Sequence, residues 1–299
     1  MEQEQVVADF SVSDNWIVLS PLEQSIKKKI EAVGTPLKDW KDIKIYRGVL
    51  TGCNEAFIID SAKREEILFN CQSDEERERT AELIRPILRG RDIKRYGYVD
   101  NGLYLINTHN GIKDKLPRID IKEYPAIKAH LDQYWDKIST RTDKGDTPYN
   151  LRSCAYLEDF SKPKVVYMEI QTDNPAEGYP FPCYSYDDNR CVVLNTGYIM
   201  SSKTTDSRYV LGILNSRLGK FLVKLYVTQL QERQFRMLSQ YVMRFPIVQP
   251  SKEQEAEMIQ LVQDVLEHQS AILEKRIDEL AFQIYGLSEP EIKVLMTGS

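Results

Sequence analysis

The chain has 299 residues, of which 40 are basic and 45 are acidic, so its formal net charge is −5. With 42% hydrophobic and 28% charged residues, the composition is that of a globular protein, which excludes collagen-like, wholly disordered and disulfide-stapled chains. No apolar run approaches the roughly 18–20 residues of a membrane-spanning helix, and the acidic first twenty residues show no secretory signal. The five cysteines form no C-x-x-C pair, which is typical of reduced thiols. Together these features predict a cytoplasmic protein without membrane association.

The acidic excess is concentrated in the C-terminal segment. Residues 251–299 contain ten acidic and four basic side chains, whereas residues 201–250 contain eight basic and two acidic ones. A second basic stretch, residues 85–95, has five arginines and lysines and one opposing acid, Asp92. The net charge therefore does not exclude a polyanionic partner, although solvated surface faces would give the same pattern.

The predicted elements alternate irregularly between helix and strand. A capping box with proline at the first helical position, Ser20 to Glu23, starts a helix that Gly34 ends. Capping signals and helical spacing of apolar side chains predict further helices from Ser73, over 124–138 and over 207–226. The predicted strands are Ile43–Leu50, Ala56–Ile59, Leu103–Asn107, Val165–Ile170 and Val192–Met200. Because strands and helices do not alternate regularly, we predict an α+β fold with a mixed, mostly antiparallel sheet and packed helices.

A long C-terminal helix is predicted from Pro250 to Gly286. Apolar side chains recur there every seven residues, at Ile259, Leu266, Leu273 and Leu280. One helix cannot bury such a stripe by itself. Residues 251–285 therefore either fold back on the body of the protein or pair with another helix in a coiled coil, for example by self-association.

Signatures of catalysis and cofactor binding are missing. No two of the fourteen glycines lie closer than four positions, which excludes G-x-G-x-x-G, and no Gly-Lys-Ser/Thr sequence occurs, which excludes a P-loop. The three histidines and five cysteines lack the spacing of a zinc site. D-x-K pairs such as Asp92–Lys94 occur by chance at this charge content, and no proline precedes an aspartate, so a PD-(D/E)-x-K nuclease is disfavoured. We predict no catalytic residue, no metal and no cofactor in this chain.

Several longer strings resemble one family of DNA-modifying enzymes. The two most specific are Ile45–Asp60, IYRGVLTGCNEAFIID, and Ile84–Tyr96, IRPILRGRDIKRY. Seven shorter strings follow in order: Tyr104–Thr108, Tyr124–Leu131, Arg141–Gly145, Tyr149–Arg152, Phe160–Val166, Leu214–Ser216 and Tyr241–Ile247. Over about residues 16–290 the chain resembles the C-terminal specificity domain, or target recognition domain, of type IIG restriction-modification adenine methyltransferases. It is also similar to type I restriction specificity subunits.

The resemblance implies a module that reads duplex DNA while catalysis lies elsewhere. In such enzymes a separate N-terminal domain binds S-adenosylmethionine and carries an Asn-Pro-Pro-Tyr/Phe motif; here Asn174 and Pro175 are followed by alanine. The chain is then an excised domain or a stand-alone subunit. Its parts would be a helical lead-in at 1–36, a DNA target recognition domain at 37–250 and an assembly segment at 251–299. Its expected partners are double-stranded DNA and a methyltransferase or endonuclease, to which S-adenosylmethionine and Mg²⁺ would belong.

Ten side chains are predicted to contact DNA, because such contacts need cations for phosphates and bidentate donors for base edges. They are Arg89, Arg91, Lys94, Arg95, Arg141, Lys144, Arg152, Arg233, Gln234 and Arg236. The alternatives are ion pairing with Asp92 for the first arginines, a plain turn after residue 140, and an exposed helix face for the last three. The rival hypothesis is a scaffold protein that assembles through 251–285 without specific DNA binding. An enzyme in its own right ranks third.

Overall fold

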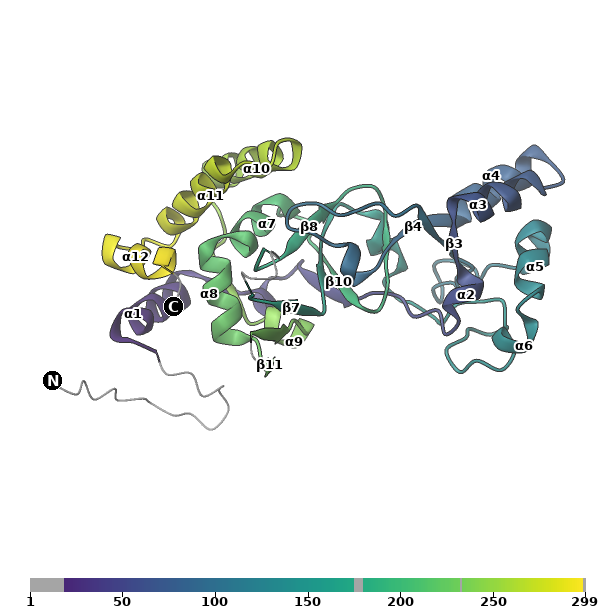
Figure 1. The fold of residues 1–299 in the computed structure, drawn as a ribbon, viewed down its shortest axis with the longest axis horizontal. Helices are drawn as coiled ribbons and strands as arrows, with labels where there is room; N and C mark the ends of the chain where they lie inside the picture. The colour runs from purple at the N-terminus through teal and green to yellow at the C-terminus, as the bar shows by residue number, and fades with distance from the viewer. Residues whose placement is uncertain (1–18, 175–179, 232, 298–299) are drawn as a thin grey trace.

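The computed structural model describes residues 19–174, 180–231 and 233–297. Figure 1 shows an elongated molecule in which three groups of elements follow one another along the long axis. Helices from both ends of the chain lie at one end of the molecule, the main β structure lies in the middle, and residues 54–138 form most of the other end.

A four-stranded antiparallel sheet separates two hydrophobic cores. Its strands, in spatial order, are β2 (Lys44–Arg47), β10 (Gly197–Ser201), β6 (Lys164–Met168) and β8 (Tyr184–Asp187). Successive side chains of a strand point to opposite faces. In β6, Val165 and Tyr167 therefore join one core and Val166 joins the other. Burial on both faces explains why β6 and β10 contain continuous apolar runs instead of an alternating pattern.

A second sheet organises the end of the molecule formed by residues 54–138. Its strands, in spatial order, are β3 (Ile58–Asp60), β5 (Leu103–Ile106), β4 (Ile84–Leu88) and β9 (Val192–Val193). The pair β4–β9 is parallel and the other neighbours are antiparallel. The helices of this end are α2 (Asn54–Phe57), α3 (Ser61–Phe69), α4 (Asp74–Leu83), α5 (Pro125–Asp132) and α6 (Trp135–Ile138).

Helices cover the other face of the central sheet. They are α1 (Pro21–Val33), α7 (Ser207–Asn215), α8 (Arg217–Tyr226), α10 (Lys252–Glu267), α11 (Ala271–Ile284) and α12 (Glu289–Thr297). A Cβ on Gly212 of α7 would lie 2.3 Å from the Met258 sulfur of α10, so this glycine lets the two helices approach closely. The first and last helices also meet, because Lys29 Nζ lies 2.7 Å from Glu291 Oε2.

Smaller elements complete the fold. Two short sheets are formed by β1 (Thr35–Pro36) with β13 (Pro246–Ile247), and by β11 (Gln229–Gln231), β12 (Gln234–Arg236) and β7 (Ile170–Thr172). One further helix, α9 (Ser239–Val242), precedes β13. The 3-10 turns are η1 (Leu37–Asp39), η2 (Gly90–Asp92), η3 (Ile121–Glu123) and η4 (Leu157–Ser161).

The α+β class and the mostly antiparallel sheets are confirmed, but the continuous C-terminal helix is wrong. The backbone leaves the helical conformation at His268, and Ser270 caps α11 by accepting a hydrogen bond from the Ile272 N–H. The predicted helix over 207–226 is interrupted in the same way, because the Ser216 hydroxyl caps α8 by accepting from the Gly219 N–H. The predicted helix over 124–138 likewise divides into α5 and α6.

The C-terminal helices fold back on the body of the protein. Of the predicted stripe, Leu280 is buried, and Leu266 and Leu273 are partly buried against the same core. Met258, Val262 and Val265 of α10 and Ile277 and Leu280 of α11 are buried in the same core as α1, α7 and α8. Self-association and the division into three parts stay predictions. No helix among the described residues is both long enough and apolar enough to cross a bilayer.

Candidate nucleic-acid interface

The basic string that follows β4 forms a tight corner at η2. Arg89 donates two hydrogen bonds of 2.8 Å to the carboxylate of Asp92, which is almost completely buried. A Cβ on Gly90 would lie 2.7 Å from the Thr196 carbonyl oxygen, so only glycine fits this corner. Burial raises the pKa of Asp92, but the hydrogen bonds and charge of Arg89 outweigh burial and leave this pKa below its usual value. For Arg89 the structure therefore shows the ion-pair alternative.

The other three cations of this string have different surroundings. Arg91 is exposed, and no hydrogen bond or ion pair joins its side chain to another described residue. Lys94 Nζ donates to the Arg91 carbonyl oxygen at 3.0 Å. Arg95 is tied to α11, because its Nε and Nη2 lie 2.8 and 2.6 Å from Glu274 Oε2. Arg91 and Lys94 thus remain near solvent, whereas Arg95 joins the corner to a C-terminal helix.

Arg141 lies in the interior and not on a mobile loop. Only 7% of its surface is exposed, and its guanidinium donates to the backbone carbonyls of Thr51, Asp143 and Asn150. It also lies over the Phe57 ring, 4.5 Å from the ring centroid. Burial lowers the pKa of Arg141 from its usual value. Arg141 therefore fixes its loop against the first family string, and its position does not support a contact with DNA.

Lys144 and Arg152 lie at the surface around that loop. Lys144 Nζ donates to the Ser139 carbonyl oxygen at 2.7 Å. The Arg152 side chain is 65% exposed, and its nearest acid is the Asp143 carboxylate, with an N–O distance of 3.3 Å. Exposed pairs of this kind are worth about 0–1 kcal/mol, so Arg152 can exchange Asp143 for a phosphate.

The polar run near residue 233 is a β-hairpin and not a helix face. Arg233 lies at the turn between β11 and β12 with φ +62°, and it is exposed. Gln234 is half-buried in β12, opposite Thr172 of β7. Arg236 Nε and Nη2 lie 3.0 and 2.9 Å from Glu169 Oε1. The hairpin therefore presents Arg233 outward and holds Arg236 beside an acid.

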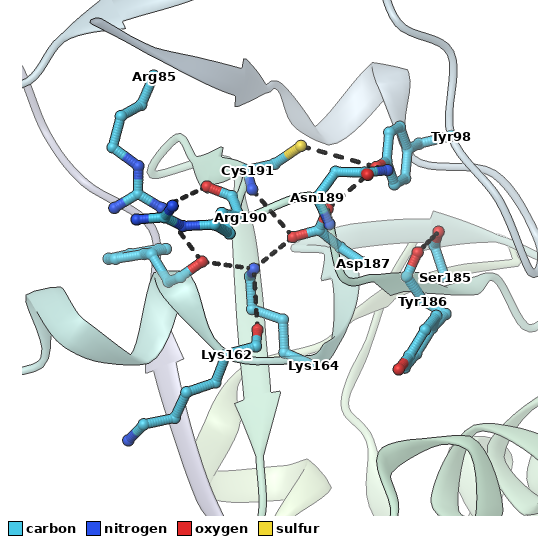
Figure 2. Close-up of polar contacts among 11 residues, drawn as sticks. Arg85, Tyr98, Lys162, Lys164, Ser185, Tyr186, Asp187, Asn189, Arg190 and Cys191 are labelled. Atoms are coloured by element: carbon cyan, nitrogen blue, oxygen red, sulfur yellow. Dashed lines mark hydrogen bonds and ion pairs between the residues drawn. The ribbon is translucent and has the colours of Figure 1, made fainter. Parts of the chain in front are cut away.

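A buried polar network joins the central sheet to the residues just before β9 of the second sheet (Figure 2). Lys164 and Asp187 form an ion pair in which both side chains are fully buried. Lys164 Nζ also donates to the Phe160 carbonyl oxygen at 2.7 Å, and Asp187 accepts from the Tyr98 hydroxyl at 3.0 Å. The Cys191 N–H, just before β9, donates to Asp187 as well, at 3.1 Å. Every charge of the pair has several partners, which indicates a structural role.

A groove of about 300 Å³ opens where the first family string, the end of β5 and residues 151–157 meet. We call it the central groove. Its polar lining consists of Arg47, Asn107, His109, Arg152, Ser153 and Asn195. Arg47 and Arg152 are 51% and 65% exposed and give the groove a cationic rim. A Cβ on Gly48 would lie 2.1 Å from the Leu194 carbonyl oxygen, so glycine is required for the chain to form this wall.

Two uncharged side chains lie inside the central groove. Asn107 is 5% exposed, and its amide oxygen is buried without a hydrogen-bond partner among the described residues. The Nδ1 atom of His109 accepts a hydrogen bond from the Gly111 N–H at 3.2 Å, which places the ring proton on Nε2. Burial lowers the pKa of His109, so the ring is neutral at pH 7.

A larger cavity, of about 640 Å³, lies between α8 and α11. Its cations face carboxylates, in the pairs Arg95–Glu274, Lys220–Asp173 and Arg217–Asp278. These carboxylates line the cavity itself, whereas no carboxylate is among the described residues that line the central groove, so the cavity is a poorer site for a polyanion. No group of three or more side chains suited to holding a metal ion gathers in the described parts of the chain.

The structure brings two of the predicted cations, Arg152 and Arg236, together with Arg47, which was not among the predicted DNA contacts. Arg47 Nη2 lies 2.7 Å from Glu169 Oε2, and Arg236 binds the other oxygen of the same carboxylate. Arg152 lines the same groove as Arg47. Arg47 and Asn107 both lie within the strings that resemble the family, and this position was the sequence evidence that pointed to them. The neighbouring residues in the sequence do not indicate that either side chain can contact a ligand.

Comparison with known proteins finds one matching domain family and solved structures with a similar fold. The sequence profile of the TaqI-like C-terminal specificity domain matches residues 85–247. The solved structure of the type IIL restriction-modification enzyme MmeI in complex with DNA is similar, with a TM-score of 0.60 and 12% identity over 88% of this chain. The type IIG restriction endonuclease BpuSI is similar as well, with a TM-score of 0.51 and 13% identity over 92% of this chain.

This chain spans only about a third of both solved proteins, namely 35% of MmeI and 34% of BpuSI. At such low identity the two structures show a shared fold and nothing more. The profile match, in contrast, covers more than half of the chain and includes all but the first residue of the second family string. It confirms the resemblance seen in the sequence: the chain belongs to the family of TaqI-like C-terminal specificity domains.

Proposed function

We propose that this chain is the DNA-recognition module of a restriction-modification enzyme. It binds a specific site in duplex DNA and presents that site to an adenine methyltransferase, and to an endonuclease, in another domain or subunit. The observation that carries this proposal is the match of residues 85–247 to a specificity domain. S-adenosylmethionine and Mg²⁺ would bind the catalytic part, and the complex would act in the cytoplasm.

The distribution of exposed cations supports this function. The side chains of Arg47, Arg152 and Arg236 are each about half exposed or more. Arg152 pairs with the partly exposed Asp143, whereas Arg47 and Arg236 share the buried carboxylate of Glu169. Exposed ion pairs contribute little to stability, so Arg152 can turn to a phosphate without loosening the fold. Glu169 keeps one cation when either Arg47 or Arg236 turns to a phosphate, because both arginines bind it. Arg91 and Arg233 are exposed as well. Arg89 and Arg141 have buried partners and are expected to hold the surface in shape.

The rival hypothesis of a helix-mediated scaffold has lost its main support. It required an apolar face on residues 251–285 that was free to meet another helix. In the structure Leu280 of this stripe is buried in the hydrophobic core of the same chain, and Leu266 and Leu273 are partly buried against that core. No other observation favours a scaffold over a DNA-binding module.

The proposal is tested by selecting bound duplexes from a random library, with the full chain alone and together with its catalytic partner. Fluorescence anisotropy then compares the selected duplex with a scrambled one between 50 and 200 mM salt. We expect tighter binding to the selected duplex, with an affinity that falls steeply as salt rises. Failure to prefer any duplex over the scrambled one, with the partner present, would refute the proposed function.

Two variants locate the phosphate contacts in the same assay. We expect Arg47→Ala and Arg152→Ala to weaken binding to both duplexes alike, and each to reduce the slope of log affinity against log salt by about 1. Arg276→Ala is the matched control, because Arg276 is an exposed arginine of α11 and does not line the central groove. If Arg276→Ala changes the slope as much as Arg152→Ala does, the central groove is not where DNA binds.

A further inference from the structure

We propose that the central groove binds one unstacked base of the bound DNA, and that the Asn107 amide hydrogen-bonds to the edge of this base. The inference rests on the proposed function and names the part of the DNA that this groove takes. It makes Asn107 a specificity-determining residue, in addition to the cations that contact phosphates.

The first observation is the unpaired amide of Asn107. The residue is 5% exposed, it lines the groove, and its amide oxygen has no hydrogen-bond partner among the described residues. Buried polar atoms in folded proteins are nearly always hydrogen-bonded, so an unpaired one in a groove marks a place where a ligand supplies the partner. The backbone is fixed, because the Asn107 N–H donates to Leu83 and its carbonyl accepts from the His109 N–H at 2.7 Å.

The second observation is that the interior of the groove suits a base better than a phosphate. A carboxamide presents a donor and an acceptor side by side, as does the edge of a base, whereas a phosphate presents acceptors only. His109, beside Asn107, is neutral and offers an N–H, so it adds no positive charge at this depth. The positive charge is at the rim, on Arg47 and Arg152. A nucleotide would therefore bind with its phosphate at the rim and its base inside.

The third observation concerns depth. A base that is still stacked in a duplex presents only its edge in a groove of the DNA, and this edge cannot reach an amide that is 5% exposed. A base that has left the stack can enter a pocket of this kind. Its faces would meet apolar walls, because Val49, Leu151 and Leu157 also line the groove.

The experiment uses the full chain and the duplex selected above. A one-nucleotide bulge is placed at each position of the site in turn. The affinity of the protein for each bulged duplex is compared with its affinity for the same duplex in which the bulged nucleotide is abasic. At one position we expect the duplex with the base to bind about tenfold more tightly, the size of effect that one bidentate contact gives. A 2-aminopurine at that position should become brighter on binding, as an unstacked base does.

Two variants assign the effect to the amide. Asn107→Ala, and Asn107→Asp, which removes the donor, should each bring the tenfold preference close to one. The affinity for the scrambled, fully paired duplex is measured in parallel, so that a loss of the preference for the base is distinguished from a general loss of DNA binding. Asn70→Ala is the matched control, because Asn70 is an exposed asparagine at the end of α3 and does not line the groove.

The outcomes separate this proposal from the proposed function. Duplex binding without any preference for the base, or with a preference that survives Asn107→Ala, overturns the groove proposal and leaves DNA recognition standing. No duplex binding at all overturns both. Thermal unfolding provides a further check: because the amide oxygen has no internal partner, Asn107→Ala should keep the melting temperature of the wild type, and a large fall would show that the amide serves the fold instead.

Discussion

At the scale of single residues, the arginines differ in what surrounds their guanidinium groups. Arg89 and Arg141 have buried acceptors, Arg95 binds a glutamate of a distant helix, and Arg152 points to solvent. All four were predicted to contact DNA because each is positively charged and lies in a basic or polar stretch of the sequence. Which of them is free for a phosphate depends on acceptors such as Glu274, which lies 179 positions from Arg95. No local pattern could have revealed it.

A buried carboxyl of α11 allows a prediction about stability and pH. Burial raises the pKa of Asp278 from 3.8 to about 6, against the hydrogen bond from the Arg217 N–H. The carboxyl therefore has a pKa of about 6 in the folded protein and of about 3.8 in the unfolded chain. Between these pH values the folded protein binds more protons than the unfolded chain, so the free energy of unfolding decreases as the pH rises from about 4 to 6. Asp278→Asn keeps an acceptor for the Arg217 N–H and removes this decrease.

We therefore expect Asp278→Asn to be more stable than the wild type at pH 7, by about 2–3 kcal/mol, and equally stable near pH 4. Urea denaturation at pH 4, 5.5 and 7 measures the difference. Glu279→Gln is the matched control, because this carboxylate is exposed on the same helix. Equal stability of Asp278→Asn and the wild type at pH 7 would contradict the prediction.

At the scale of elements, the buried pair of Lys164 and Asp187 decides how the two sheets meet. It joins β6 and β8 of the central sheet to the start of β9, which pairs with β4 of the second sheet. The string that contains Lys164 was recognised from its sequence, but its lysine could equally have been at the surface. The fully buried position follows from β6 lying between two cores.

Replacing one partner of this pair should destabilise the protein strongly. Lys164→Met leaves the Asp187 carboxylate buried without its counter-charge, for which we expect a loss of about 3–5 kcal/mol in chemical denaturation. Lys128→Met is the control: its ion pair with Asp132 is exposed, so a loss below about 1 kcal/mol is expected. If the two variants lose equal amounts, the buried pair does not hold the sheets together.

The broken helices show a second limit at the scale of elements. Apolar spacing correctly predicted helical structure over 207–226 and 250–286, yet it did not reveal the breaks at Ser216 and Ser270. Serine is tolerated inside a helix and favoured at its first cap, so the residue alone does not distinguish the two cases. The packing of α10 against α7 selects the broken form, because one continuous helix could not return over the body.

At the scale of the whole molecule, the C-terminal helices are part of the main core. The contrast between two isoleucines of α11 tests this. Ile277 is fully buried, whereas Ile272 is 74% exposed. We expect Ile277→Ala to lower the free energy of unfolding by about 2–5 kcal/mol without changing the molar mass of the protein. Ile272→Ala should change the free energy of unfolding by less than about 0.5 kcal/mol.

Denaturation and light scattering give the two readouts for both variants. A fall in molar mass with Ile272→Ala, at unchanged stability, would favour self-association through this segment. It would do so because Ile272 is the exposed apolar side chain of α11 that a partner helix could cover. Unchanged stability with Ile277→Ala would show that α11 is not part of the core.

The sequence by itself determined the α+β class, the places of most helices and strands, and the family, because all three depend on local periodicity, capping residues and contiguous strings. Only the tertiary structure decided which cations are exposed, where the C-terminal stripe is buried, and that Arg47, Asn107, Arg152 and Asn195 line one groove. These properties depend on contacts between segments that lie far apart in the sequence, such as Arg95 and Glu274, which are 179 positions apart. Burial and hydrogen bonding are set by such distant neighbours, so the residues that can meet DNA are defined by the fold.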